Sequence, residues 1–259
     1  MSDVARLIGI VERLRAPDGC PWDREQTHES LRAALVEECY EAVEAIVRAD
    51  DANLREELGD LLLHVVMHAH MAGERQAFTF EEVVDGVCEK LVRRHPHVFG
   101  AATAGDSGEV LKQWEQIKRS EKGEGASVLD GLPSSLPALL RAQNAQKKAA
   151  RVGFDWGAAS EVFLKLDEEI DELTAALKEG KPMEIEEEFG DLLFTAVNLG
   201  RHLGVDAETS LAASTSKFIR RFRALESSLA SRGLRVEDCS SAALEEEWEK
   251  AKLNGSGPD

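Results

Sequence analysis

The sequence predicts an all-α protein that consists of two related helical-bundle domains in tandem. Apolar side chains recur at helical spacing through most of the 259 residues, and no segment shows the alternation of a β-strand. Five acidic positions of one segment also recur 131 residues later without a gap, together with a glycine and a pair of leucines. Chance is a poor explanation of so many matches, so the repeat indicates two copies of one helical unit.

The first copy is predicted to contain five helices. They are expected over residues 4–15, 27–49, 53–72, 79–95 and 109–119. The first helix ends at a Pro-Asp-Gly turn, and a Cys-Pro-Trp-Asp loop follows at 20–23, where Asp23 and Gln26 are expected to cap the next helix. The helix over 79–95 stops because Pro96 cannot continue it.

The second copy repeats this plan. Its helices are expected over residues 138–151, 159–180 and 182–203, with one further helix around Lys217 and a last one around Trp248. The predicted domain limits are 1–119 and 138–253, with a Ser- and Gly-rich linker at 120–137 and a disordered tail at 254–259.

The repeated acids fall on the helical hairpin of each copy, beside its apolar stripe. Glu38 lies within about 20° of Leu31 on a helical wheel. Burying an unpaired carboxylate is costly, so such a residue needs a cation or hydrogen-bond donors. A hairpin that gathers four carboxylates suits a hard divalent cation. The candidate ligands are Glu38, Glu41, Glu57 and Asp60 in the first copy, and Glu169, Glu172, Glu188 and Asp191 in the second.

Each copy also carries two pairs of side chains at i and i+4, a spacing that puts both on one helix face. The pairs are Lys90 with Arg94, Trp114 with Lys118, Lys217 with Arg221, and Trp248 with Lys252. Lys and Arg can hold phosphate oxygens, and Trp can stack on a flat ring. A metal ion, these cations and an aromatic platform together are typical of a site for a nucleoside polyphosphate. Taken alone, the basic pairs are more typical of surface charge, and the tryptophans of core or interface anchors.

Composition excludes several classes of partner. The net charge of −18 argues against binding to nucleic acid or to an anionic membrane, because phosphate contact is driven by Lys and Arg. Charged residues near the N-terminus leave no room for the apolar core of a signal peptide, and no apolar run is long enough to cross a bilayer. The four cysteines form no C-x-x-C pair and are interpreted as free thiols, so a cytoplasmic location is expected.

The acidic pattern resembles the MazG family of nucleoside triphosphate pyrophosphohydrolases. The resemblance rests on E-E-x-x-E with a downstream E-x-x-D, present twice, and it covers essentially the whole chain. It extends to the Cys-Pro-Trp-Asp loop, to the Arg-Arg-His-Pro-His-Val-Phe run at 93–99 and to the Lys-Phe-Ile-Arg-Arg-Phe run at 217–222.

The resemblance implies an all-α, Mg²⁺-dependent homodimer, in which Mn²⁺ can replace Mg²⁺. Its expected reaction splits NTPs and dNTPs between the α and β phosphates, giving NMP and pyrophosphate, as a housecleaning step on the nucleotide pool. The catalytic set that it implies is Glu168, Glu169, Glu172, Glu188 and Asp191, with nucleotide contacts from Lys165, Glu168, Glu187, Lys217, Arg221, Trp248 and Lys252. The counterparts of the last four in the first copy are Lys90, Arg94, Trp114 and Lys118. Both copies carry the acidic pattern, and the C-terminal copy resembles the catalytic copy of family members.

Other interpretations stay open at this point. His64 and His68 share a helix face and can bind metal, although ordinary packing is the more common role of such histidines. Glu25-x-x-His28 is the single E-x-x-H in the sequence, whereas a di-iron bundle needs two. The main alternative function is a non-catalytic nucleotide sensor or partner-binding protein that uses the same acidic sites. No residue indicates the preferred base.

Overall fold

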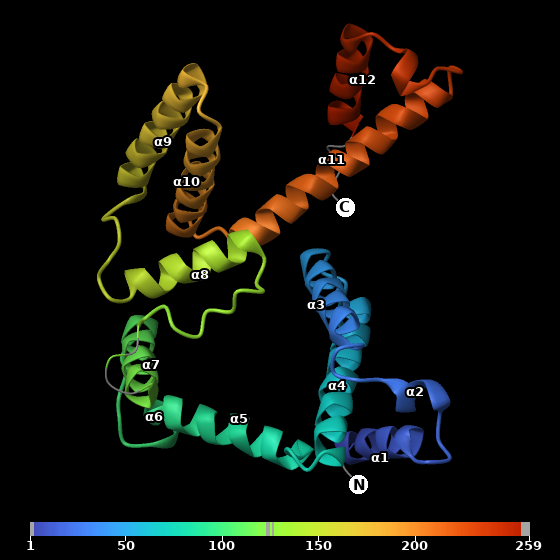
Figure 1. The fold of residues 1–259 in the computed structure, drawn as a ribbon, viewed down its shortest axis with the longest axis vertical. Helices are drawn as coiled ribbons and strands as arrows, with labels where there is room; N and C mark the ends of the chain where they lie inside the picture. The colour runs from blue at the N-terminus through green and yellow to red at the C-terminus, as the bar shows by residue number, and fades with distance from the viewer. Residues whose placement is uncertain (1–2, 123–124, 126, 255–259) are drawn as a thin grey trace. The chain divides into compact units, whose positions relative to one another are not determined.

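The computed structural model describes residues 3–122, 125 and 127–254, and this part of the chain contains helices and no strand (Figure 1). The predicted all-α class is therefore confirmed. None of the helices described is both long enough and apolar enough to cross a membrane.

The chain forms two compact units, and the boundary between them along the sequence lies between Val110 and Leu111. The first contains α1 (Asp3–Arg15), α2 (Pro21–Glu25), α3 (Arg32–Val47), α4 (Asp51–Glu74), α5 (Phe80–Arg94) and α6 (Pro96–Phe99). The boundary falls inside α7 (Ser107–Lys122), and the second unit continues with α8 (Ala138–Ala150), α9 (Ala159–Glu179), α10 (Pro182–His202), α11 (Ala207–Ala230), the 3-10 helix η1 (Val236–Asp238) and α12 (Ser241–Asn254). The domain limits predicted at 119 and 138 stay predictions, and most of the predicted tail lies outside the residues described.

The first unit is built on the hairpin of α3 and α4, with α1 packed against α4 (Figure 1). Its core gathers Val11 of α1, Leu31, and Val66, Met67 and Met71 of α4. Asp50 is the N-cap of helix α4, and its carboxylate accepts hydrogen bonds from two backbone N–H groups. The apolar faces of α1 and α4 therefore hold the acidic face of the hairpin in place.

Two predicted elements of the first unit are wrong. Residues 21–25 form α2 instead of a loop, because Pro21 occupies the first helical turn, where its fixed φ is favourable. Helix α3 begins at Arg32 and not at Thr27, because Thr27 and Ser30 exchange hydrogen bonds between side chains and backbone and close a separate turn. The expected Asp23–Gln26 cap is also absent, since the Gln26 side chain donates to the carbonyl oxygen of Trp22.

The second unit is built on the corresponding hairpin of α9 and α10, with α8 packed against α10 (Figure 1). Gly180 ends α9 with a left-handed backbone, φ 65°, which glycine adopts at little cost. Gln143 of α8 is buried, and at the start of α11 its amide donates to the Val205 carbonyl and accepts from the Ala207 N–H. Helix α12 folds back along α11, so α11 and α12 form a second hairpin.

Candidate metal centre and adjoining cavity

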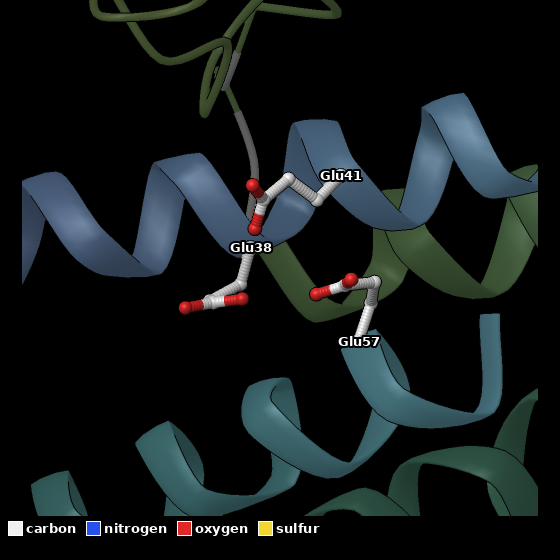
Figure 2. A group of neighbouring side chains, drawn as sticks. All are labelled: Glu38, Glu41 and Glu57. Carbon is white, nitrogen blue, oxygen red and sulfur yellow. The ribbon is translucent and has the colours of Figure 1, made fainter. Parts of the chain in front are cut away.

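The first acidic cluster brings together Glu38 and Glu41 of α3 and Glu57 of α4. One carboxylate oxygen from each lies within 4.8 Å of the others, and Figure 2 shows the three side chains converging between the helices. Glu57 is buried, Glu38 is half-buried and Glu41 is exposed. Burial, followed by the nearby charge of Asp60, raises the pKa of Glu38 to about 7. The cluster is thus strongly self-repelling when all its acids are ionised.

The second cluster repeats this arrangement with Glu169 and Glu172 of α9 and Glu188 of α10, whose oxygens again lie within 4.8 Å of one another. Burial, followed by the charges of Glu172 and Asp191, raises the pKa of Glu188. Among the residues described, these two clusters are the groups of three or more His, Cys, Asp or Glu side chains able to hold a metal ion. The hairpin geometry therefore brings together three of the four predicted acids in each copy, and the fourth lies close enough to affect their pKa values.

A lysine distinguishes the second cluster from the first. Lys165 Nζ lies 2.9 Å from Glu168, 3.1 Å from Glu169 and 3.9 Å from Glu172. Hydrogen bonds to Glu168 and Glu169 raise the pKa of Lys165 above its ordinary value, so it stays charged. At the 131-residue offset, Ala34 stands at this position in the first copy. This difference between the copies is visible in the sequence alone, at the offset that aligns the acids, although it was not among the predicted features.

A cavity of about 430 Å³ in the second unit adjoins this cluster. Lys165, Glu169 and Asp191 lie in its wall, so the cation and two of the acids face a common space. Glu169 is only 4% exposed, and its carboxylate accepts a hydrogen bond from the Thr195 hydroxyl at 3.4 Å in addition to the contact with Lys165. A ligand in the cavity would thus meet a buried and partly paired carboxylate.

The loop between α8 and α9 covers one side of the cavity with Phe154 and Trp156. Asp155 fixes this loop to α10, since it accepts hydrogen bonds from Arg201 Nη1 at 2.9 Å and from His202 Nε2 at 3.1 Å. Burial acts to raise the pKa of Asp155, but the hydrogen bonds from Arg201 and His202 outweigh it and lower that pKa. The Phe-Asp-Trp sequence is similar to the Pro-Trp-Asp loop of the first copy, and all three of its residues line the cavity.

The remaining predicted nucleotide contacts lie apart from the cavity. Lys217 and Arg221 are on α11, and Trp248 and Lys252 are on α12; none of the four lines the cavity. The ring of Trp248 packs against Phe218, with 5.3 Å between centroids. Their first-copy counterparts, Lys90 and Arg94 on α5 and Trp114 and Lys118 on α7, occupy separate helices, and Lys118 pairs with Glu115. Glu187 is exposed on α10 next to Glu188. The structure therefore joins the acids to Lys165 and Glu168, and leaves the other cations on their own helices.

Three histidines gather in the first unit. His28 Nδ1 lies 2.7 Å from His68 Nδ1, their rings are stacked with centroids 5.0 Å apart, and the His64 ring is 6.2 Å from that of His68. Arg75 donates to His28 Nε2, so the Nδ1 of a neutral His28 carries the proton that is shared with His68. Neither acidic cluster in the described part of the chain includes a histidine, and the contact that these rings make is stacking between α4 and the turn before α3.

Comparison with known proteins agrees with this geometry. The model of the MazG nucleotide pyrophosphohydrolase domain matches residues 26–99 and again 159–225, which are the two acidic hairpins and the helices that follow them. The nucleoside triphosphate pyrophosphohydrolase/pyrophosphatase MazG of Thermotoga maritima is 51% identical over 95% of this chain and 94% of its own length. The nucleoside triphosphate pyrophosphohydrolase of Escherichia coli K12 is 47% identical over 97% of this chain and 98% of its own length.

These matches extend over both copies, and they confirm the resemblance that the repeated acids indicated. The chain belongs to the MazG nucleotide pyrophosphohydrolase family.

Proposed function

We propose that this chain hydrolyses nucleoside triphosphates, both NTPs and dNTPs, between the α and β phosphates and releases NMP and pyrophosphate. The observation that carries the proposal is the second acidic cluster, which adjoins Lys165 at the wall of a cavity. A cavity of about 430 Å³ falls within the range of small-molecule sites, roughly 300–1,000 Å³. The relatives described above are named nucleoside triphosphate pyrophosphohydrolases, which supports hydrolysis of nucleoside triphosphates by this chain.

The proposed metal is Mg²⁺, with Mn²⁺ as a substitute. Each cluster offers only carboxylate oxygens, which are the ligands that hard divalent cations prefer. The raised pKa values of Glu38 and Glu188 support this choice, because a bound cation relieves the repulsion that burial and neighbouring acids impose. When bound, the ion would neutralise phosphate charge and lower the pKa of a water molecule.

The metal ligands proposed for the second copy are Glu169, Glu172, Glu188 and Asp191. Lys165 would hold a phosphate oxygen, since its ammonium group lies at the wall of the cavity between Glu168 and Glu169.

Glu168 is the proposed general base, which accepts the proton of the attacking water. It is exposed, it is held by Lys165 at 2.9 Å and it lies outside the metal cluster. The oxygen of the attacking water would bond to the α-phosphorus, its proton would pass to Glu168, and the bond to the β-phosphate oxygen would break. Pyrophosphate and the nucleoside monophosphate are then the two products.

The second copy is the better candidate for turnover. It has Lys165 where the first has Ala34, and Asn198 where the first has Met67. Met67 is buried in the core of the first unit, whereas Asn198 lines the cavity of the second. The first copy thus keeps the acids but fills the equivalent position with an apolar side chain.

A homodimer is part of the proposal. A two-helix hairpin buries only one face of each helix, and α9 and α10 leave large apolar side chains exposed. Examples are Phe163, Leu164, Ile170, Leu177, Phe189 and Leu193. A second chain would cover such a surface, and either chain could then supply Lys217, Arg221 or Lys252 to the phosphates. The four cysteines are unpaired, which supports the expected cytoplasmic location.

The experiment is to incubate the purified chain with dNTPs and Mg²⁺ and to identify the phosphate product. Pyrophosphate together with NMP is expected, and Mg²⁺ removal by a chelator should stop its release. Orthophosphate would move the cut to the β–γ bond and refute the proposed chemistry. Nucleotide binding without any product would favour the alternative of a non-catalytic sensor.

A further inference from the structure

The two oxygens of the buried carboxylate Glu169 have different surroundings. Glu169 Oε1 lies 3.1 Å from Lys165 Nζ, and it also accepts the hydrogen bond from the Thr195 hydroxyl at 3.4 Å. A carboxylate oxygen has about two lone pairs, so these two contacts occupy Oε1. In the described part of the chain, the lone pairs of Oε2 are therefore the ones that Glu169 can offer to a metal ion.

The two partners of Oε1 come from different helices. Lys165 precedes Glu169 by one turn of α9, its side chain is 32% exposed, and it also contacts Glu168. Thr195 is on α10 and is only 8% exposed. Among the residues described, its hydroxyl is thus the hydrogen-bond donor that ties this carboxylate to the facing helix of the hairpin.

Thr195 is suited to hold the carboxylate in one orientation. Its side chain is branched at Cβ and therefore stiff at χ1, and it is buried at the wall of the cavity. A hydroxyl has one proton to donate, and this one goes to Glu169. Lys165 would turn its ammonium group towards a phosphate oxygen in the proposed function, and Thr195 would then remain as the partner of Oε1.

The first copy lacks this hydroxyl. At the 131-residue offset, Glu38 stands in the place of Glu169 and His64 in the place of Thr195. The Nδ1 atom of His64 is buried without a hydrogen-bond partner. The lysine is also absent from the first copy, as described above. The exchange of threonine for histidine therefore distinguishes the surroundings of two carboxylates that occupy the same position of the repeat.

We propose that Thr195 is a positioning residue of the second metal site, which holds Glu169 so that this carboxylate binds the ion through Oε2 alone. The proposal rests on the proposed function, since it concerns the metal ion of the same site. Hydrogen bonds of this kind orient the ligands of many metal sites, and their loss typically costs roughly 10–100-fold in metal affinity.

The positioning also affects which ion is preferred. Mg²⁺ is small, demands octahedral geometry and keeps several waters, whereas Ca²⁺ accepts either one or both oxygens of a carboxylate. A carboxylate with one oxygen already occupied suits Mg²⁺ better than Ca²⁺. The Thr195 hydroxyl should therefore contribute more to the binding of Mg²⁺ than to the binding of Ca²⁺.

The test measures metal binding to the nucleotide-free chain. The EPR signal of free Mn²⁺ reports how much of that ion is bound, and displacement of Mn²⁺ by Mg²⁺ or by Ca²⁺ gives the Kd of each. Every protein carries Glu38→Gln, so that the first copy contributes little. Thr195→Val keeps the shape of the side chain and loses the hydroxyl. It should raise the Kd of Mg²⁺ roughly tenfold and change the Kd of Ca²⁺ by no more than about twofold. Thr195→Ser keeps the hydroxyl and should bind Mg²⁺ within about twofold of the protein with Thr195.

Ser228→Ala is the matched control. The Ser228 hydroxyl donates at 2.7 Å to Glu247, a carboxylate that is as buried as Glu169, at 4% exposure, and that also contacts the cations of Arg232 and Lys250. The substitution removes a hydroxyl from a buried carboxylate outside the metal cluster. It should lower thermal stability and leave the Kd of Mg²⁺ and of Ca²⁺ unchanged.

The outcomes separate this role from the proposed function. Unchanged Mg²⁺ binding in Thr195→Val overturns the positioning role, while the proposed function stands. Equal weakening by Thr195→Val and Thr195→Ser would assign the effect to packing, and equal weakening of Mg²⁺ and Ca²⁺ would assign it to a general loss of the site; either result also overturns the role. If the protein with Thr195 binds neither Mn²⁺ nor Mg²⁺, the metal site of the proposed function is itself refuted.

Discussion

Replacing Glu169 by glutamine should separate the metal response of the second unit from its stability. Glutamine has nearly the same shape and can still accept the hydrogen bond from Thr195. The substitution loses one attraction, to Lys165 at 3.1 Å, and removes two repulsions, from Glu172 and Glu188 within 4.8 Å. Coulomb energies scale inversely with distance, so these effects nearly cancel and stability without Mg²⁺ should change by no more than about 1 kcal/mol.

With Mg²⁺ the two proteins should differ. A ligand at 100 times its Kd stabilises the folded state by about 2.7 kcal/mol. For a unit of this size the gain corresponds to a rise in Tm of roughly 5–10 °C. Glu169→Gln removes a buried carboxylate that we propose as a metal ligand, and this rise should largely vanish.

The assay is thermal unfolding with and without Mg²⁺ at constant ionic strength. The protein with Glu169 and the Glu169→Gln variant both carry Glu38→Gln, so that the first copy contributes little to the rise in Tm with Mg²⁺. Glu247→Gln is the control, because Glu247 is equally buried at 4% exposure but bonds Ser228, Lys250 and Arg232, away from the metal cluster. It should lower Tm at every Mg²⁺ concentration and keep the Mg²⁺ response. An undiminished Tm rise in the Glu169→Gln protein would falsify the assignment of this carboxylate as a metal ligand.

Two further predictions concern turnover and acid stability. Glu172→Ala should lower the rate of pyrophosphate release from dATP at least about 100-fold, a loss comparable to removing one group that stabilises the transition state. Glu41→Ala should keep more than about half of the activity. The double variant should match Glu172→Ala, and the reverse ranking of the single variants would assign turnover to the first copy. Burial lowers the pKa of His64 and of His68, so both are neutral in the folded chain, and the stability that depends on their neutrality is complete above the ordinary histidine pKa of about 6.5. The free energy of unfolding should fall as the pH drops from about 6.5 towards the lowered pKa values of the folded chain, and His64→Leu should make that fall smaller. The measurement is the urea midpoint at pH 7.5 and at pH 5.5. An equal decrease of the midpoint in the intact chain and in His64→Leu would contradict the prediction.

Much of the fold could be predicted from local patterns. Helical periodicity located the two acidic hairpins, and α9 and α10 begin and end within a residue or so of their predicted limits. The acids could be grouped from sequence because residues spaced by three or four on each helix face one way, and a short hairpin connection forces the two faces together. The late start of α3 could not be predicted, because the Thr27–Ser30 turn competes with a helix that the same residues would tolerate.

The sequence by itself determined the helical class, the duplication and the acidic pattern, since each depends on spacing along the chain. The tertiary structure alone decided which carboxylates are buried, Glu57 in the first copy and Glu169 in the second, although the two occupy different positions of the repeat. It also decided that Gln146 would keep a buried oxygen without a hydrogen-bond partner while Gln143, one turn away, would use both ends of its amide. The physical reason is that burial and hydrogen-bond partners depend on which distant helix packs against a residue, and one-dimensional periodicity carries no record of that contact.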